Sequence, residues 1–314
     1  MRKFALLPIG LAWALFVQMA ATVAATPAMA SGPAIWRIRS ADSTVYLFGS
    51  IHILPHGYPW MTRRIADAMD ASDLFVFEIP IDNDTRAEER EFTAKYGVLR
   101  ERQSIRGVLT QGEFDRYAAV MQAAGLSARD YERYRPWLAS LMLGLAYLHP
   151  DDLTALRGAD DEVMTFAREH KRQSEYLESV QQQLELLTSG SEASHIAELR
   201  HLIDTLPSSR DTESELLAAW SSGNIDRLSA ELAGIFNPSP ETEKFLLSQR
   251  NHLWLSTIRP LLQRPGTTMI TVGAAHIAGS DGLIALICGE GYRVERLLDS
   301  RADSDACPAI AASP

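Results

Sequence analysis

The strand-like segments of this chain lie near both of its ends, with a long helical region between them, and this arrangement most constrains the fold. Residues 34–39 and 44–49 predict a β-hairpin, because two short apolar or alternating runs flank a Ser-Ala-Asp-Ser turn. Residues 73–80, DLFVFEIP, predict a strand with apolar side chains on both faces, as in a parallel sheet covered by helices. Residues 267–272 and 292–297 predict further strands. Segments from both ends must therefore share one sheet.

The regions between these strands predict helices. Residues 61–72 carry apolar side chains at helical spacing and complete a strand–helix–strand opening. The region from about 85 to 262 predicts a large helical insert that caps the sheet and contains one short strand at 174–177. We expect an α/β fold, with α+β as the alternative, in a single domain at 31–300, followed by a flexible tail at 301–314. The other expected helices are at 85–97, 113–124, 135–148, 160–170, 179–206, 211–221, 225–234, 241–262 and 282–289.

Residues 1–30 predict a secretory signal peptide. Arg2 and Lys3 form a short basic start, an uncharged apolar stretch follows, and Ala28-Met29-Ala30 resembles a cleavage site. The alternative is an uncleaved N-terminal membrane anchor, because the uncharged stretch is long enough to span a bilayer. We expect an exported protein, periplasmic or secreted, with no membrane span once the signal is removed.

Charge and cysteine content limit the partners. The formal net charge is −10, and no basic cluster follows the leader, so we expect no nucleic-acid partner. The chain has two cysteines, Cys288 and Cys307, and in an exported protein these could form a disulfide. With no third cysteine and no C-x-x-C motif, thiolate zinc sites and thioredoxin-like chemistry are excluded.

Two matching sequence motifs provide the main indication of function. Residues 47–53 read LFGSIHI and residues 270–277 read ITVGAAHI, so each apolar run ends in Gly-x-x-His-Ile. In a parallel sheet, ligands bind beyond the carboxyl ends of the strands, where His52, His276 and Glu78 are all expected to lie. The glycines permit a tight turn with close approach of the backbone. Two imidazoles and one carboxylate suit a divalent ion of the Mn, Co or Zn class.

A less specific interpretation of these residues also stands. A single histidine after a strand is more often a hydrogen-bonded loop residue than a metal ligand, and a glutamate before Ile-Pro could cap a neighbouring helix. The sequence has no H-E-x-x-H helix, no G-x-S-x-G elbow and no P-loop. From the residues alone, the metal site remains one of two open interpretations.

At these motifs the chain resembles the TraB/GumN family, which includes the TIKI metalloproteases and is related to the erythromycin-esterase/ChaN-like superfamily. The resemblance runs from about Trp36 to Leu298. It rests on several segments that occur in the order typical of the family. These are LFGSIHILPHGYPW, LFVFEIP, the Gly-Ala-Asp at 158–160, YLESVQQQLELL, SQRNHLW and VGAAHIAGSDGLIALICGEGYRV.

The resemblance implies an erythromycin-esterase/ChaN-like fold and a metal-dependent hydrolase, with a peptide or small molecule as substrate. It places the metal on His52, Glu78 and His276. Glu178 becomes a carboxylate that orients the ligands or a general base, and Arg250 its partner or an oxyanion-stabilising group. A buried ion pair that orients helices explains both residues nearly as well. The other family positions are Gly49, Ser50, Asp160, Gln183, Asn251 and Gly273.

Two further functions remain open for such a site. A non-catalytic protein that binds haem, iron or another ligand could also use two histidines. A regulatory interaction protein with a vestigial site is the other alternative.

Overall fold

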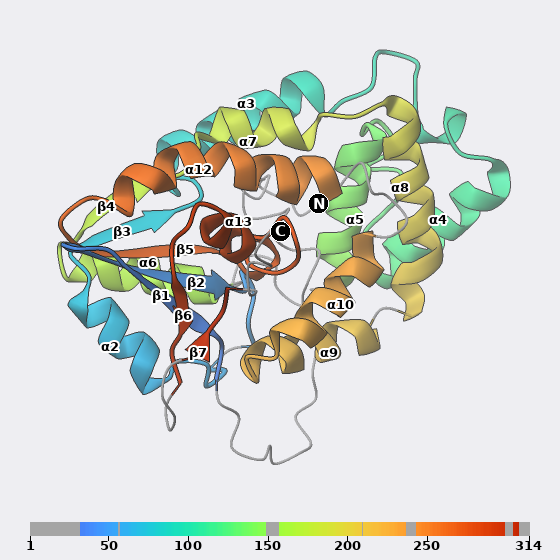
Figure 1. The fold of residues 1–314 in the computed structure, drawn as a ribbon. Helices are drawn as coiled ribbons and strands as arrows, with labels where there is room; N and C mark the ends of the chain where they lie inside the picture. The colour runs from blue at the N-terminus through green and yellow to red at the C-terminus, as the bar shows by residue number, and fades with distance from the viewer. Residues whose placement is uncertain are drawn as a thin grey trace, which may run out of the picture.

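The computed structural model describes residues 32–55, 57–148, 157–208, 210–236, 243–298 and 304–307. The predicted signal peptide and most of the predicted tail lie outside these residues. Within them, the strands form one seven-stranded mixed sheet in the order β4-β3-β5-β2-β1-β6-β7, which confirms the expected α/β class (Figure 1). The strands are β1 (Ile35–Arg39), β2 (Ser43–Ser50), β3 (Leu74–Phe77), β4 (Gln173–Tyr176), β5 (Gly266–Gly273), β6 (Val294–Arg296) and β7 (Ser304–Asp305).

Four neighbouring strands of this sheet, β4, β3, β5 and β2, are parallel, so their carboxyl ends share one edge. The predicted hairpin is confirmed as an antiparallel β1–β2 pair, and β6 and β7 extend the sheet antiparallel beyond β1. Strand β5, from the far end of the sequence, lies between β2 and β3. Segments from both ends of the chain therefore share one sheet, as the apolar runs predict.

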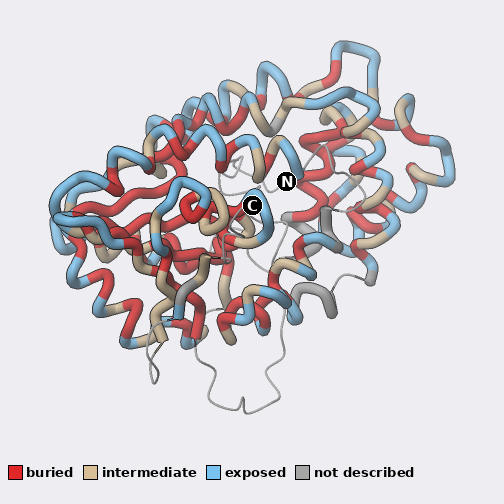
Figure 2. Tube along the Cα trace, in the orientation of Figure 1, coloured by how far each residue is buried: buried red, intermediate tan, exposed pale blue. Residues whose placement is uncertain are grey.

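Side chains alternate between the two faces of the sheet and bury two separate cores. In β3, for example, Phe75 joins one apolar cluster and Val76 the other. The first face is covered by helices α2 (Arg63–Ala71) and α6 (Ala159–Glu169), and the second by α12 (Gln249–Leu261) and α13 (Leu283–Gly289). The strands are buried along most of their length, whereas the outer helices expose one side (Figure 2). The result is a three-layer α/β/α core.

The remaining helices all belong to the helical insert. They are α3 (Asn83–Tyr96), α4 (Gln111–Ala123), α5 (Pro136–Leu148), α7 (Val180–Leu187), α8 (Glu192–Thr205), α9 (Arg210–Ser221) and α10 (Ile225–Phe236). The insert is not only a cap, because β4 and α6 within it complete the sheet and one of its covering layers.

The prediction of one helix over 179–206 is wrong. Residues 188–191 separate α7 from α8, because Gly190 takes a φ of 110° that favours glycine. Ser191 then begins α8 by accepting a hydrogen bond from the Ser194 backbone N–H at 3.0 Å.

Two other segments differ from the expected elements. The predicted helix at 241–262 begins with a π-helical turn at Lys244–Ser248 before α12. In the predicted flexible tail, β7 pairs with β6, and a disulfide joins Cys288 to Cys307. Within the described part of the chain, no helix combines the length and apolar character needed to cross a bilayer.

Candidate functional site

The carboxyl ends of the four parallel strands bring the candidate residues together. His52 follows β2, Glu78 follows β3, Glu178 follows β4, and Gly273 ends β5 three residues before His276. The Glu178 backbone N–H donates a hydrogen bond to the Glu78 carbonyl at 3.0 Å, so the ladder between these strands continues to the site. All four ionisable side chains are less than a tenth exposed.

The two motif glycines leave room for this convergence. A Cβ atom at Gly273 would lie 3.0 Å from His52 Nε2, 3.3 Å from Glu78 Oε1 and 3.7 Å from a ring carbon of His276. A Cβ at Gly49 would lie 3.1 Å from the Cα of Ala274. Neither glycine has a positive φ. Close approach, rather than a left-handed turn, therefore explains both glycines.

His52 is oriented by the first turn of α6. Its Nδ1 donates a hydrogen bond to Asp160 Oδ2 at 2.6 Å, and its Nε2 is buried with no partner among the described residues. Gly158 lets α6 dock here, because a Cβ at that position would lie 2.4 Å from the His52 Cα. A carboxylate on Nδ1 directs the second ring nitrogen toward a ligand. Asp160 is thus both a residue of the first helical turn, as expected, and the partner of His52.

His276 is oriented by α12. Its Nδ1 donates to the Asn251 side-chain oxygen at 2.7 Å, and the Asn251 amide group donates to the backbone carbonyl of His276 at 3.3 Å. The indole of Trp254 packs against the imidazole with ring centroids 4.4 Å apart. These contacts fix the tautomer with a lone pair on Nε2.

Arg250 joins the site into one network. Its guanidinium donates to Glu78 Oε2 at 2.5 Å, to Glu178 Oε1 at 2.6 Å and to His276 Nε2 at 3.0 Å. Its Cζ also lies 4.6 Å from the ring centroid of Trp254. A buried arginine that binds two carboxylates holds the ends of β3, β4 and β5 in register with α12.

Both carboxylate oxygens of Glu178 already accept hydrogen bonds. Oε1 accepts from Arg250 and from Gln183 Nε2, the latter at 3.2 Å, and Oε2 accepts from the Trp254 indole at 2.9 Å. This arrangement favours the orienting role of Glu178 over the role of general base.

Burial and neighbouring charges set the protonation of the site without a metal. Burial disfavours a charged imidazole, but the Asp160 carboxylate outweighs it and raises the pKa of His52 to about 9. Burial likewise disfavours ionised Glu78, yet Arg250 and the imidazoles lower its pKa to about 2. For His276, burial and then Arg250 lower the pKa to about 3, so this imidazole is neutral.

The buried charges suit a divalent cation. Glu78, Glu178 and Asp160 carry three negative charges against the single positive charge of Arg250. Protonated His52 leaves an excess of one negative charge, and loss of its Nε2 proton to a bound ion would leave two, which a divalent ion would balance. His52 Nε2 is the donor atom that fits best, because it has no partner among the described residues, and Glu78 Oε1 nearby accepts a hydrogen bond from the Gly273 N–H at 2.7 Å.

One contact must change before all three proposed ligands can bind one ion. His276 Nε2 lies 3.9 Å from Glu78 Oε1 and accepts a hydrogen bond from Arg250. Across the described residues, no group of three His, Cys, Asp or Glu side chains is arranged to hold a metal ion as it stands. Arg250 would therefore have to release His276 when the ion binds.

A small pocket gives access to this site. His52, Glu78 and Asp160 line one part of it, and Phe77 and Ile79 contribute an apolar wall. Asp160 Oδ1 is buried without a partner among the described residues, as is His52 Nε2. The remaining lining residues are Ser50, Ile81, Met164 and Thr271.

Two tryptophans belong to the site but are missing from the motif-based expectation. Trp254 touches Glu178, Arg250 and His276, and the Trp220 indole donates to the Gly49 carbonyl at 2.7 Å. Trp254 lies four residues after Arg250, on the same side of a helix, and this spacing is visible in the sequence. Trp220 comes from the insert and carries no comparable signal.

The geometry defines a mixed α/β protein with a buried histidine–glutamate–arginine site at the carboxyl ends of parallel strands. The chain belongs to the TraB/PrgY/gumN family, whose model matches residues 34–296, and the resemblance inferred from the motifs is thereby confirmed. It is similar to an uncharacterized protein of Treponema pallidum (strain Nichols), at 22% identity over 269 residues that cover 80% of this chain and 79% of that protein. No solved structure matches it.

Proposed function

We propose that this chain is an exported metal-dependent hydrolase in which His52, Glu78 and His276 hold a divalent ion of the Mn, Co or Zn class. The observation that supports it most is the pair of buried imidazoles whose Nδ1 atoms are already hydrogen-bonded, beside three buried carboxylates and a single buried arginine. A bound divalent ion would supply a Lewis acid and a water that ionises more readily.

Other residues of the chain orient the two histidines and Arg250. Asp160 and Asn251 hold the Nδ1 protons of the two histidines, so that Nε2 is the ring nitrogen left to bind an ion on each. Glu178 fixes the guanidinium of Arg250, which keeps one positive charge available for an oxyanion or a substrate carboxylate. The apolar wall of the pocket suits an apolar side chain, which favours peptides as substrates.

The test is the metal content of the mature protein, purified without chelator or histidine tag and measured by mass spectrometry. We expect about one ion per chain, the stoichiometry of a mononuclear site. The H52A/H276A variant should lose the ion and the hydrolysis of a peptide library. The control is H170A, because His170 is exposed and lies outside the site.

Two results would contradict the proposal. One is a parent protein that takes up no Mn, Co or Zn even on titration. The other is a folded H52A/H276A variant that hydrolyses peptides as fast as the parent.

A further inference from the structure

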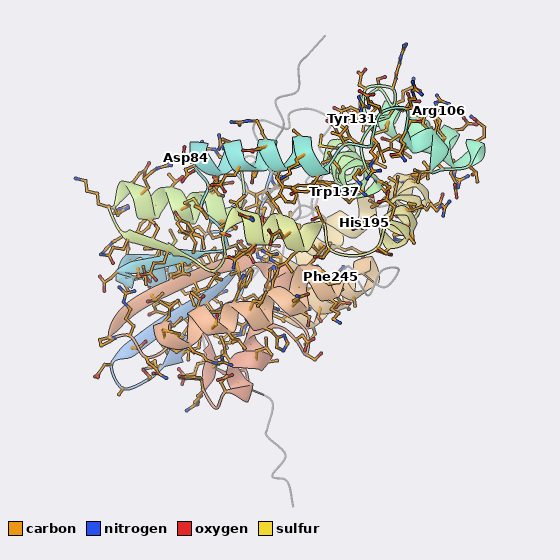
Figure 3. The ribbon with its side chains drawn as sticks, turned by 90° about the horizontal axis from the view of Figure 1, so that it is seen from above. Asp84, Arg106, Tyr131, Trp137, His195 and Phe245 are labelled. Carbon is orange, nitrogen blue, oxygen red and sulfur yellow. A yellow bond between two sulfur atoms is a disulfide. The ribbon has the colours of Figure 1, made fainter. Side chains whose placement is uncertain are left out.

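A second pocket lies in the helical insert. It is lined by nine residues between Lys95 and Val108, by Arg135 immediately before α5, and by Glu192 at the start of α8. Figure 3 shows this part of the insert, marked by Arg106 and Tyr131, at the end of the molecule away from the strands. We call this the insert pocket. It shares no lining residue with the candidate metal site.

The insert pocket is basic, although the chain as a whole carries a formal charge of −10. Its lining includes Lys95, Arg100, Arg102 and Arg135, and the one carboxylate among the described lining residues is Glu192. Glu192 is already paired with Arg135, whose Nη2 donates to it at 2.8 Å. Arg100 and Arg102 are exposed and form no ion pair with any described residue. Two exposed arginines therefore line the pocket without an ion-pair partner in the described part of the chain.

The backbone that carries these two arginines is strained. Arg102 has a φ of 67°, in the left-handed region that costs a non-glycine residue about 1–2 kcal/mol. The Gln103 N–H donates to the Arg100 carbonyl at 3.0 Å and closes a tight turn around this position. Glycine would fit the turn without cost, so the chain keeps an arginine at a position where its backbone favours glycine.

The turn is held by a rigid support on both sides. The Leu99 N–H donates to the Arg133 carbonyl at 2.7 Å, and the Arg133 guanidinium returns a bond to the Leu99 carbonyl at 3.1 Å. The Ile105 N–H donates to the Glu132 carbonyl at 2.8 Å. Side chains on a fixed turn lose less conformational entropy on binding, so this support pre-organises Arg100 and Arg102.

We propose that the insert pocket binds a phosphate-bearing anion, with Arg100 and Arg102 as its principal contacts. The planar guanidinium fork matches the oxygens of a phosphate and donates two parallel hydrogen bonds. Gln103 and Ser104 add neutral donors along the same wall. Because Lys95 and Arg135 line the pocket together with this turn, a ligand with more than one negative charge fits best. A soluble polyphosphate and a phospholipid head group both have this chemistry.

Binding of tripolyphosphate, measured by titration calorimetry at low ionic strength, tests the proposal. R100Q/R102G should weaken binding about tenfold or more, because each lost bond to a charged group is worth about 1.5–3 kcal/mol. The matched control is K171G, which also removes a basic residue at a positive φ, 54°, but lies outside the pocket. Glycine at 102 relieves the backbone, so R102G alone should melt no lower than the parent and still bind more weakly.

Sedimentation with phosphatidylglycerol vesicles separates the two sources of phosphate. Vesicle binding that is lost in R100Q/R102G assigns the pocket to a lipid head group, and tripolyphosphate binding without vesicle binding assigns it to a soluble ligand. Absence of binding to either probe overturns the proposal. So does binding that K171G weakens as much as R100Q/R102G does.

Discussion

Glu198 provides a quantitative test of the packing in the helical insert. It lies in α8 with only 8% of its surface exposed, and its Oε2 is buried without a hydrogen-bond partner among the described residues. Burial raises the pKa of this carboxyl from 4.5 to about 7. A group whose pKa is higher in the folded chain binds its proton more tightly there. The proton on Glu198 therefore contributes its full stabilisation of the folded chain below pH 4.5, and this stabilisation is lost as the pH rises through 7.

The expected magnitude follows from the two pKa values. The pKa is about 7 in the folded chain and 4.5 in the unfolded chain. Ionisation of Glu198 above pH 7 therefore lowers the unfolding free energy by about 3 kcal/mol. Glutamine has nearly the shape of the protonated acid and never ionises. E198Q should therefore be more stable than the parent by up to about 3 kcal/mol at pH 8, with the difference close to zero at pH 4.

Urea unfolding of the parent and E198Q across this pH range measures the difference directly. The control is E91Q, because Glu91 is an exposed glutamate on α3 and its replacement tests the loss of a surface charge alone. An E198Q–parent difference that stays constant between pH 4 and 8 would refute the reasoning, since an unpaired buried carboxylate must show its cost as it ionises.

Three other changes test the site and the C-terminal strands. G273A should lower metal affinity about tenfold or more in a metal titration, because its methyl group would lie 3.0 Å from His52 Nε2 and force that side chain to shift. R250M leaves two buried glutamates without their cation and should lower the unfolding free energy by about 3–5 kcal/mol in urea; unchanged stability would contradict the network described. C288S/C307S should cost about 3 kcal/mol in the same assay, since the disulfide closes a loop of 19 residues. A loss below 1 kcal/mol would show that this loop is constrained by other contacts.

The main strands, and the sharing of one sheet by segments from both chain ends, could be predicted because their cause is local. The apolar runs at β2, β3 and β5 require burial on both faces, and that requirement alone places segments from both chain ends in one sheet. The Gly-x-x-His phrases then place His52 and His276 at the same edge, once the strands are known to be parallel.

Other features could not be predicted because they depend on contacts between distant segments. The Trp220–Gly49 hydrogen bond joins the insert to β2, and no residue spacing in the sequence indicates it. The position of Arg250 between two carboxylates and His276 is likewise a property of the assembled fold. The break between α7 and α8 could have been predicted, because Ser-Gly-Ser at 189–191 is typical of a turn. The long apolar periodicity on both sides obscured this signal.

The place of β5 between β2 and β3 has a consequence for how the protein is made. During synthesis β2 and β3 leave the ribosome early, but each must wait for residues 266–273 before it gains its central neighbour. Contacts at such sequence separation form slowly, so the parallel pairs on both sides of β5 form only after this strand has been made. A chain interrupted before β5 therefore lacks the strand that joins β2 to β3 and brings His52 and Glu78 together. Assembly of the site thus depends on a late step of folding.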